Sequence, residues 1–451
     1  MRGALVAIAA AASLVPALAH ADVPRLTLDQ LVAKAQVSER ARMAAADRDA
    51  AAARVGEAKA ARLPKGTLTG FFAPSPEIEC LDPDCIRTDP SEFKLRFSGV
   101  LGGAQLSVTQ PIYTFGKLQT AREAAKLGLA AQDALADATA ADLAVDAARA
   151  YWGLKLAREL RWMLEEGEEQ ITSAMERLDE RIAGGDTEVT IQDRQRVDVL
   201  LAEARAQLAE ARQGEAQALA AVRALAGDPT VDIDEETFET VGLDLGNEAE
   251  LVARAQNARP EVKAAQAGAA AFRRLADFEA RQHYPDLAVV GSLLASGATG
   301  VDDPPSAFAY DPYNTVTGTL ALALRWQLEP WTVAAKVDRA RAVERRAVAQ
   351  ADLAVTGAAF EARTAYAEAL GAQQKLEVAG KGEKAARAWL AAVLQADAIG
   401  AAEARDLADA YIAWFQMRAR VVTAIFQWNV AAMRVRRAAG EFSAVPPRRR
   451  S

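Results

Sequence analysis

The chain contains one long stretch twice, and this duplication constrains its fold more than any other feature. The two copies cover residues 185–227 and 400–440, and each begins and ends with glycine. The spacing from Asp193 to the closing Gly227 equals that from Asp406 to the closing Gly440 (227 − 193 = 440 − 406). Between aspartate and glycine, apolar residues alternate at spacings of four and three. This pattern is typical of a coiled-coil seam rather than of an ordinary surface helix.

The duplication extends over nearly the whole chain. The sequence LVAKAQ at 31–36 returns as LVARAQ at 251–256, so we interpret residues 22–246 and 247–440 as two repeats. In each repeat we expect a helix, a pair of strands and a long helical hairpin. Residues 441–451 form a basic C-terminal tail.

The first 21 residues predict that the protein is exported. Arg2 supplies a positive charge, residues 4–15 are apolar but too few to span a bilayer, and 19–21 (Ala-His-Ala) fit a signal-peptide cleavage site. No cysteine follows this site, which argues against a lipid anchor at the new N-terminus. Beyond the signal peptide, no apolar run is long enough to predict a transmembrane helix.

Two pairs of segments alternate between apolar and polar residues, as β-strands do. They cover 67–72 with 93–109, and 287–294 with 315–326. The last segment keeps one face apolar along its whole length, which is the pattern of a membrane-barrel strand; a soluble hairpin packed on a core is the alternative. The glycine pair at 102–103 predicts a bulge or a sharp bend. Gln110 and Pro111 are expected to end their strand.

A long helical hairpin follows each strand pair. The 4-3 stripe occupies 143–182 in the first half and 358–397 in the second. Gly184 and Gly185 interrupt the first hairpin and Gly400 the second, as turns between antiparallel arms. Before the strands we expect single helices, one over 27–62 with Thr27 as its N-cap and one over 247–283.

Composition argues against several classes of function. The 451 residues are 51% hydrophobic but only 6% aromatic and carry a net charge of −8. No basic stripe is interleaved with aromatic residues, so we expect no nucleic-acid partner. With two histidines in all, and no catalytic constellation, phosphate loop or metal-ligand spacing, we expect no enzyme activity, cofactor or metal. Cys80 and Cys85 share one loop and are expected to form a disulfide in an exported chain.

The residues resemble those of the TolC-like outer-membrane efflux channels. The resemblance rests on the passage QPIYTFG at 110–116, on Ala-Tyr-Trp at 150–152 with Ala-Tyr at 365–366, and on the glycine-to-aspartate tips and the closing glycines. It covers nearly all of the mature chain. The second half departs from it at 327–331, where no glycine matches Gly116, so the local turn is expected to differ there.

The resemblance implies a mainly α-helical protein with a membrane β-barrel part. Four strands are too few to close a barrel, and an open sheet edge cannot face lipid, so several chains must share one barrel. The family implies a homotrimer with a shared twelve-stranded barrel in outer-membrane lipid and helical hairpins in the periplasm. A periplasmic adaptor protein and an inner-membrane pump would be its partners in efflux or type I secretion. The alternative is an exported periplasmic coiled-coil adaptor or scaffold without a membrane barrel.

Asp193 and Asp406 are the candidate pore-constricting residues, because they match the acidic positions near the tips in the family. A ring of carboxylates would attract cations and repel anions. The competing interpretation is that an acid in the first turn of a helix only stabilises the helix dipole. Gly184, Gly185 and Gly400 are the candidate turns at the periplasmic tips, where an adaptor would dock.

Overall fold

A computed structural model describes residues 24–77, 97–185, 190–301, 311, 313–399 and 404–442. The signal peptide at 1–21, Cys80, Cys85, Gly400 and most of the basic tail lie outside the described residues. No helix in the described ranges is both long enough and apolar enough to cross a membrane.

The chain forms two compact units, and each takes segments from both repeats. The first comprises residues 1–38, 143–242 and 371–433, and the second comprises 39–142, 243–370 and 434–451. The compact units therefore do not follow the boundaries between the sequence repeats.

Four long helices form the two hairpins. They are α3 (Lys117–Ala183) with α4 (Ile191–Ala226), and α7 (Pro330–Ala398) with α8 (Ala404–Ala438). The first arm of each hairpin, 67 or 69 residues long, extends far beyond the predicted stripe. Alanine is the strongest helix former, and no proline interrupts either arm after its first residue, so helix continues without a break up to the strand. Gly227 and Gly440 follow α4 and α8 with φ of 65° and 76°, so the closing glycines end these helices as predicted.

Ion pairs join α3 to α4 in the first unit. Arg212 and Arg205 of α4 pair with Glu165 and Glu168 of α3 at 3.2 and 2.7 Å. Nearer the tip, the Nε atom of Arg194 lies 3.0 Å from Asp179. Exposed pairs of this kind contribute little individually, but their positions show which turns of the two arms lie side by side.

The first unit also contains a contact that the sequence did not predict. The two-residue strands β1 (Arg25–Leu26) and β4 (Asp232–Ile233) pair in parallel. Beyond β4, the buried side chain of Asn429 accepts a hydrogen bond from the N–H of Val241 and donates one to the carbonyl of Glu239. Asn429 therefore substitutes for a neighbouring strand and holds the segment that connects the two repeats against α8.

The predicted single helices before the strands are each interrupted. The first is divided into α1 (Leu28–Ala35) and α2 (Glu39–Ala60), and the second into α5 (Glu248–Ala258) and α6 (Pro260–Ala280), followed by the short η2 (Arg281–His283). Pro260 explains the second break, because proline has no N–H to donate and is tolerated only in the first turn. Thr27 caps α1 as predicted and forms a capping box with Gln30.

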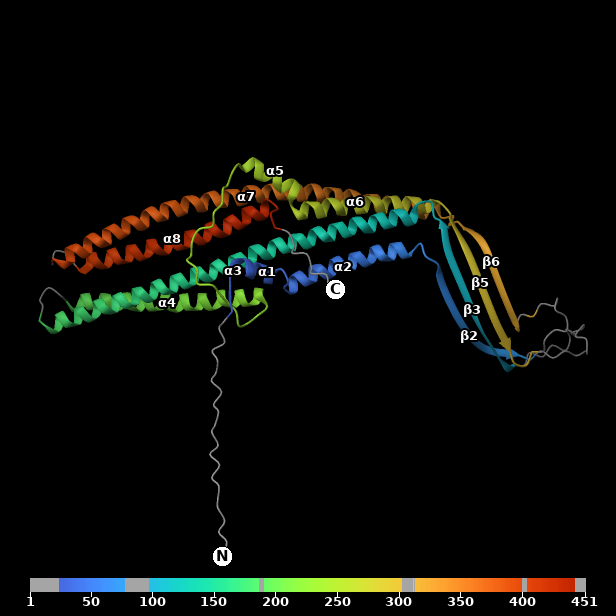
Figure 1. The fold of residues 1–451 in the computed structure, drawn as a ribbon, viewed down its shortest axis with the longest axis horizontal. Helices are drawn as coiled ribbons and strands as arrows, with labels where there is room; N and C mark the ends of the chain where they lie inside the picture. Colours follow the sequence, from blue (N-terminus) through green and yellow to red (C-terminus); the bar gives the residue numbers. More distant parts are fainter. Residues whose placement is uncertain are drawn as a thin grey trace, which may run out of the picture. The chain divides into compact units, whose positions relative to one another are not determined.

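The second unit contains an antiparallel sheet in the order β2-β3-β5-β6. The strands are β2 (Lys65–Pro76), β3 (Phe97–Tyr113), β5 (Asp286–Ala298) and β6 (Thr315–Arg325). Helices α2 and α6 lead into β2 and β5, whereas α3 and α7 leave β3 and β6. Figure 1 shows all four junctions at the same end of the sheet.

The predicted end of β3 was wrong, and the bulge offered for its paired glycines is absent. The strand does not end at Pro111 but continues to Tyr113, with a register shift between these two residues. No bulge occurs at the paired glycines, where pairing with β2 and β5 is continuous. A side chain at Gly103 would lie 2.7 Å from the ring of Phe71, so the glycine makes room for an aromatic ring on the neighbouring strand.

Candidate functional site

Gly184 and Gly185 lie directly after α3 in the first hairpin. Helix α3 ends at Ala183, and the N–H of Gly184 donates to the carbonyl of Glu180 at 2.9 Å. Gly185 has φ of 78°, in the left-handed region that glycine adopts without strain. Residues 186–189 lie outside the described residues, and Thr190 then caps α4.

Asp193 forms a capping box with Thr190. The Asp193 carboxylate accepts two hydrogen bonds from Thr190, one from its backbone N–H at 3.1 Å and one from its hydroxyl at 2.6 Å. In return, the backbone N–H of Asp193 donates to the Thr190 hydroxyl at 3.2 Å. The hydrogen bond from the Thr190 hydroxyl, and then that from its N–H, hold the pKa of Asp193 below its ordinary value. The carboxylate is therefore charged at neutral pH and also stabilises the start of its helix.

Asp406 occupies the corresponding place in the second half, in the first turn of α8, and it is exposed. Its neighbour Arg405 lies 3.8 Å from Asp409 on the same helix. A single chain does not assemble the two predicted aspartates into a ring. Their role in a pore therefore stays a prediction.

The two faces of the sheet differ in chemistry. One register row reads Leu68, Leu106, Leu293 and Gly318 across the four strands, whereas the adjacent row reads Thr67, Ser107, Ser292 and Thr319. On the apolar face Phe72 and Leu320 are 86% and 80% exposed. Large apolar side chains that are exposed together mark a surface that another apolar phase covers, and the hydroxyl face suits water.

Aromatic residues gather where the helices meet the sheet. Tyr113, Tyr284, Trp326 and Trp331 lie within a few residues of the strand ends, and each is at least half exposed. The indole N–H of Trp326 donates to the carbonyl of His283 at 3.0 Å. Aromatic rings with one polar edge are typical of the boundary between hydrocarbon and water.

The passage from β3 to α3 uses a tight turn that differs from the β6-to-α7 passage. Phe115 and Gly116 have φ of 49° and 81°, and Arg281 donates to the carbonyl of Phe115 at 3.0 Å. Beside the turn, the buried ammonium of Lys117 lies 2.9 Å from Asp286. In the second passage none of the residues 326–329 has a positive φ, and α7 begins directly at Pro330, which fulfils the expectation of a different turn.

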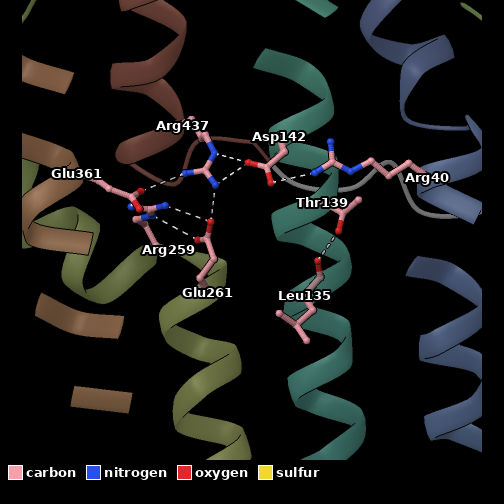
Figure 2. A network of polar contacts seen from close by, with 8 residues as sticks. All are labelled: Arg40, Leu135, Thr139, Asp142, Arg259, Glu261, Glu361 and Arg437. Carbon is pink, nitrogen blue, oxygen red and sulfur yellow. Dashed lines mark hydrogen bonds and ion pairs between the residues drawn. The ribbon is translucent and has the colours of Figure 1, made fainter. Parts of the chain in front are cut away.

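A charged cluster in the second unit was also missed by sequence reasoning. Figure 2 shows Arg437 of α8 between Asp142 of α3 and Glu261 of α6, at 2.6 Å from each. Arg259, which is almost fully buried, binds Glu261 and also reaches Glu361 of α7 at 2.6 Å. These residues are far apart in the sequence, so no local pattern could have indicated that they meet.

Comparison with known proteins identifies the family. The model of the outer membrane efflux protein family matches residues 35–228 and 251–441, one segment in each repeat. The chain therefore belongs to the outer membrane efflux protein family, as its resemblance to TolC-like channels predicted. It is an outer-membrane efflux channel, a transport protein and not an enzyme.

Solved structures of channels have the same fold. The chain is similar to CusC (17% identity, 92% of each chain covered, TM-score 0.74) and to OprN (20% identity, 92% of this chain and 89% of OprN, TM-score 0.74). It is also similar to CmeC of Campylobacter jejuni (17% identity, 92% and 86% covered, TM-score 0.75). At these identities the likeness establishes the fold only. No protein with curated annotation matches the sequence significantly.

Proposed function

We propose that three copies of this chain share one twelve-stranded barrel and form a single export duct. The observation that carries the proposal is the combination of an apolar face with two open edges. Strands β2 and β6 are the outer strands of the sheet and have a partner on one side only within the described chain. Backbone groups cannot remain unpaired in hydrocarbon, so β6 of one copy would pair with β2 of the next.

An exposed stripe on α7 supports association of the copies. Trp331, Leu353 and Phe360 are exposed, and their spacings (353 − 331 = 22 and 360 − 353 = 7) are close to whole numbers of helical turns. The three side chains therefore lie on the same side of the helix. In the duct this stripe would be covered by a neighbouring copy. A periplasmic adaptor and an inner-membrane pump would complete the system, with the adaptor docking at the hairpin tips around Gly184, Gly185 and Gly400.

The first test is the mass and location of the mature protein after extraction in mild detergent. We expect a trimer in the outer-membrane fraction. A monomer in that fraction would refute the shared barrel, because the edges of a four-stranded sheet would then be left open.

Asp193 and Asp406 would form a ring of six carboxylates at the tips of the trimer. We expect the double substitution of Asp193→Ala with Asp406→Ala to reduce the preference for cations over anions, because the ring supplies the negative potential at the constriction. The measurement is the reversal potential across a planar bilayer in a salt gradient. A control with two exposed acids away from the tips, Glu210→Ala with Asp352→Ala, should retain the preference. If both variants behave alike, the gate assignment is wrong but the duct is not.

A further inference from the structure

We propose that α7 of one copy binds α2 of the next through a complementary set of charged and apolar side chains, and this inference rests on the proposed trimer. The connectivity of the sheet indicates which helices meet. Helix α2 leads into β2 and α7 leaves β6, at the same end of the sheet. If β6 pairs with β2 of the neighbouring copy, these two helices become neighbours across the boundary between copies.

One face of α7 carries two arginines without a partner among the described residues. Asp338, Arg341, Arg345 and Val348 recur at spacings of three and four, so they share one side of the helix. The three charged residues are exposed, and none of their side chains has an ion pair or hydrogen bond to another described residue. Arg341, Arg345 and Val348, together with Glu344, line a shallow hollow of about 290 Å³. The two arginine side chains on this face are therefore free to pair with an acidic side chain of another chain.

One face of α2 carries the opposite pattern. Met43, Asp47 and Arg54 are exposed and recur at spacings of four and seven, so they also share one side of their helix. Asp47 and Arg54 have no ion pair with any residue in the described ranges. Arg48, on a different side of α2, binds Asp133 of α3 at 2.5 Å. The side of α2 that faces its own α3 is thus already occupied, and the Asp47 side is free.

The opposite charges on α2 and α7 lie at similar distances from the sheet when residues are counted along the chain. From Asp47 to Lys65, the first residue of β2, the offset is 65 − 47 = 18. From Arg325, the last residue of β6, the offsets to Arg341 and Arg345 are 341 − 325 = 16 and 345 − 325 = 20. Helices α2 and α7 each meet the same end of the sheet through a connection of four residues (61–64 and 326–329), so Asp47 of one copy would reach a level between the two arginines of its neighbour.

The residues on either side of this group match as well. Arg54 and Asp338 have opposite charges and similar offsets from the sheet (65 − 54 = 11 and 338 − 325 = 13). Met43 and Val348 have nearly equal offsets (65 − 43 = 22 and 348 − 325 = 23), and they are 69% and 46% exposed. The charge sign therefore alternates in a complementary way, and the contact ends in an apolar pair.

A membrane surface is the competing partner for exposed arginines, but the distance argues against it. The eleven helical steps from Pro330 to Arg341 alone span about 17 Å, whereas the headgroup layer extends only about 5–7 Å beyond the hydrocarbon. Arg341 and Arg345 therefore lie too far from the sheet to reach the phosphates of the bilayer that surrounds it. Helix α2 of a second copy lies at the same distance from the sheet as these arginines.

Charge reversal in the intact protein tests the proposal. We expect Arg341→Glu with Arg345→Glu to lower the temperature at which the detergent-extracted trimer dissociates on a gel. Adding Asp47→Arg to the same chain should recover most of the lost dissociation temperature. The matched control is Arg177→Glu with Arg420→Glu, which makes the same change in charge at exposed positions of α3 and α8, away from the proposed faces of α2 and α7, and should leave the trimer nearly unchanged. An equal fall in the trimer's dissociation temperature in both double variants would refute a specific contact between α2 and α7.

A disulfide between Met43→Cys and Val348→Cys, with Cys80→Ser and Cys85→Ser in the background, locates the contact directly. We expect covalent dimers and trimers on a denaturing gel after mild oxidation. Intact trimers that yield no covalent product, or a disulfide within one chain, would overturn the inference and leave the duct standing. Arginine variants that lose affinity for anionic vesicles but keep trimer stability would favour the membrane as partner. A wild-type protein that is not a trimer would refute the proposed function itself.

Discussion

Leu320→Arg is expected to prevent most of the protein from assembling in the outer membrane. Leu320 lies at the middle of β6 on the apolar face, and its side chain is 80% exposed. Placing an arginine on the lipid face near the centre of a barrel costs about 2–4 kcal/mol per chain, and the shared barrel would contain three copies. The measurement is the fraction of heat-modifiable trimer in the outer-membrane fraction.

The adjacent residue provides the control. Thr319 is on the opposite face, in the row of hydroxyl residues with Ser292, so Thr319→Arg would place the same charge in water inside the duct. We expect this variant to assemble nearly as well as the wild type and to change ion selectivity. Equal loss of assembly in both variants would contradict the assignment of the two faces.

Arg259→Met is expected to destabilise the helical part of the second unit by about 2–3 kcal/mol. The side chain of Arg259 is 4% exposed and neutralises Glu261 and Glu361. Removing one member of a buried charged group leaves the others desolvated without compensation, at a cost of about 3–5 kcal/mol for fully buried pairs. The two glutamates keep 32% and 58% of their side-chain exposure, so solvent reduces that cost.

The measurement is thermal loss of helical circular dichroism in detergent. Arg254→Met is the matched control, because its ion pair with Glu441 at 3.0 Å is exposed and contributes below about 1 kcal/mol. If both substitutions lower the unfolding temperature equally, the cluster around Arg259 contributes no more than a surface pair.

The effect of Arg259→Met should also depend on pH. Burial acts to raise the pKa of Glu261, but the hydrogen bonds from Arg259 and the charges of Arg259 and Arg437 outweigh it, so the pKa lies below its ordinary value of 4.5. A carboxylate whose pKa is depressed in the folded state stabilises the protein at pH values above its ordinary pKa. This stabilisation is lost as the pH falls through the folded pKa. The difference in unfolding temperature between the wild type and Arg259→Met, measured by circular dichroism, should therefore shrink below about pH 4.

The periodic features of this fold could be predicted from the sequence. The two repeats, the long hairpins, the four strands and the capping by Thr27 are all encoded by neighbouring residues, through apolar spacing and cap or turn chemistry. The apolar face of β6 could be assigned for the same reason, because alternate residues of a strand lie on opposite faces. The candidate aspartates at the tips were found by their equal spacing in the two repeats.

Other features depended on contacts between residues far apart in the sequence. Only the structure decided that β3 pairs with β5, that Asn429 holds the connecting segment, and that Arg259 and Arg437 meet three acids from three helices. It also showed that Gly103 accommodates the ring of Phe71 instead of forming a bulge. The sequence by itself therefore determined which elements form, because local hydrogen bonding and hydrophobic periodicity act over a few residues. The tertiary structure alone decided which elements meet and which charges are buried together, because these interactions form only when distant segments pack.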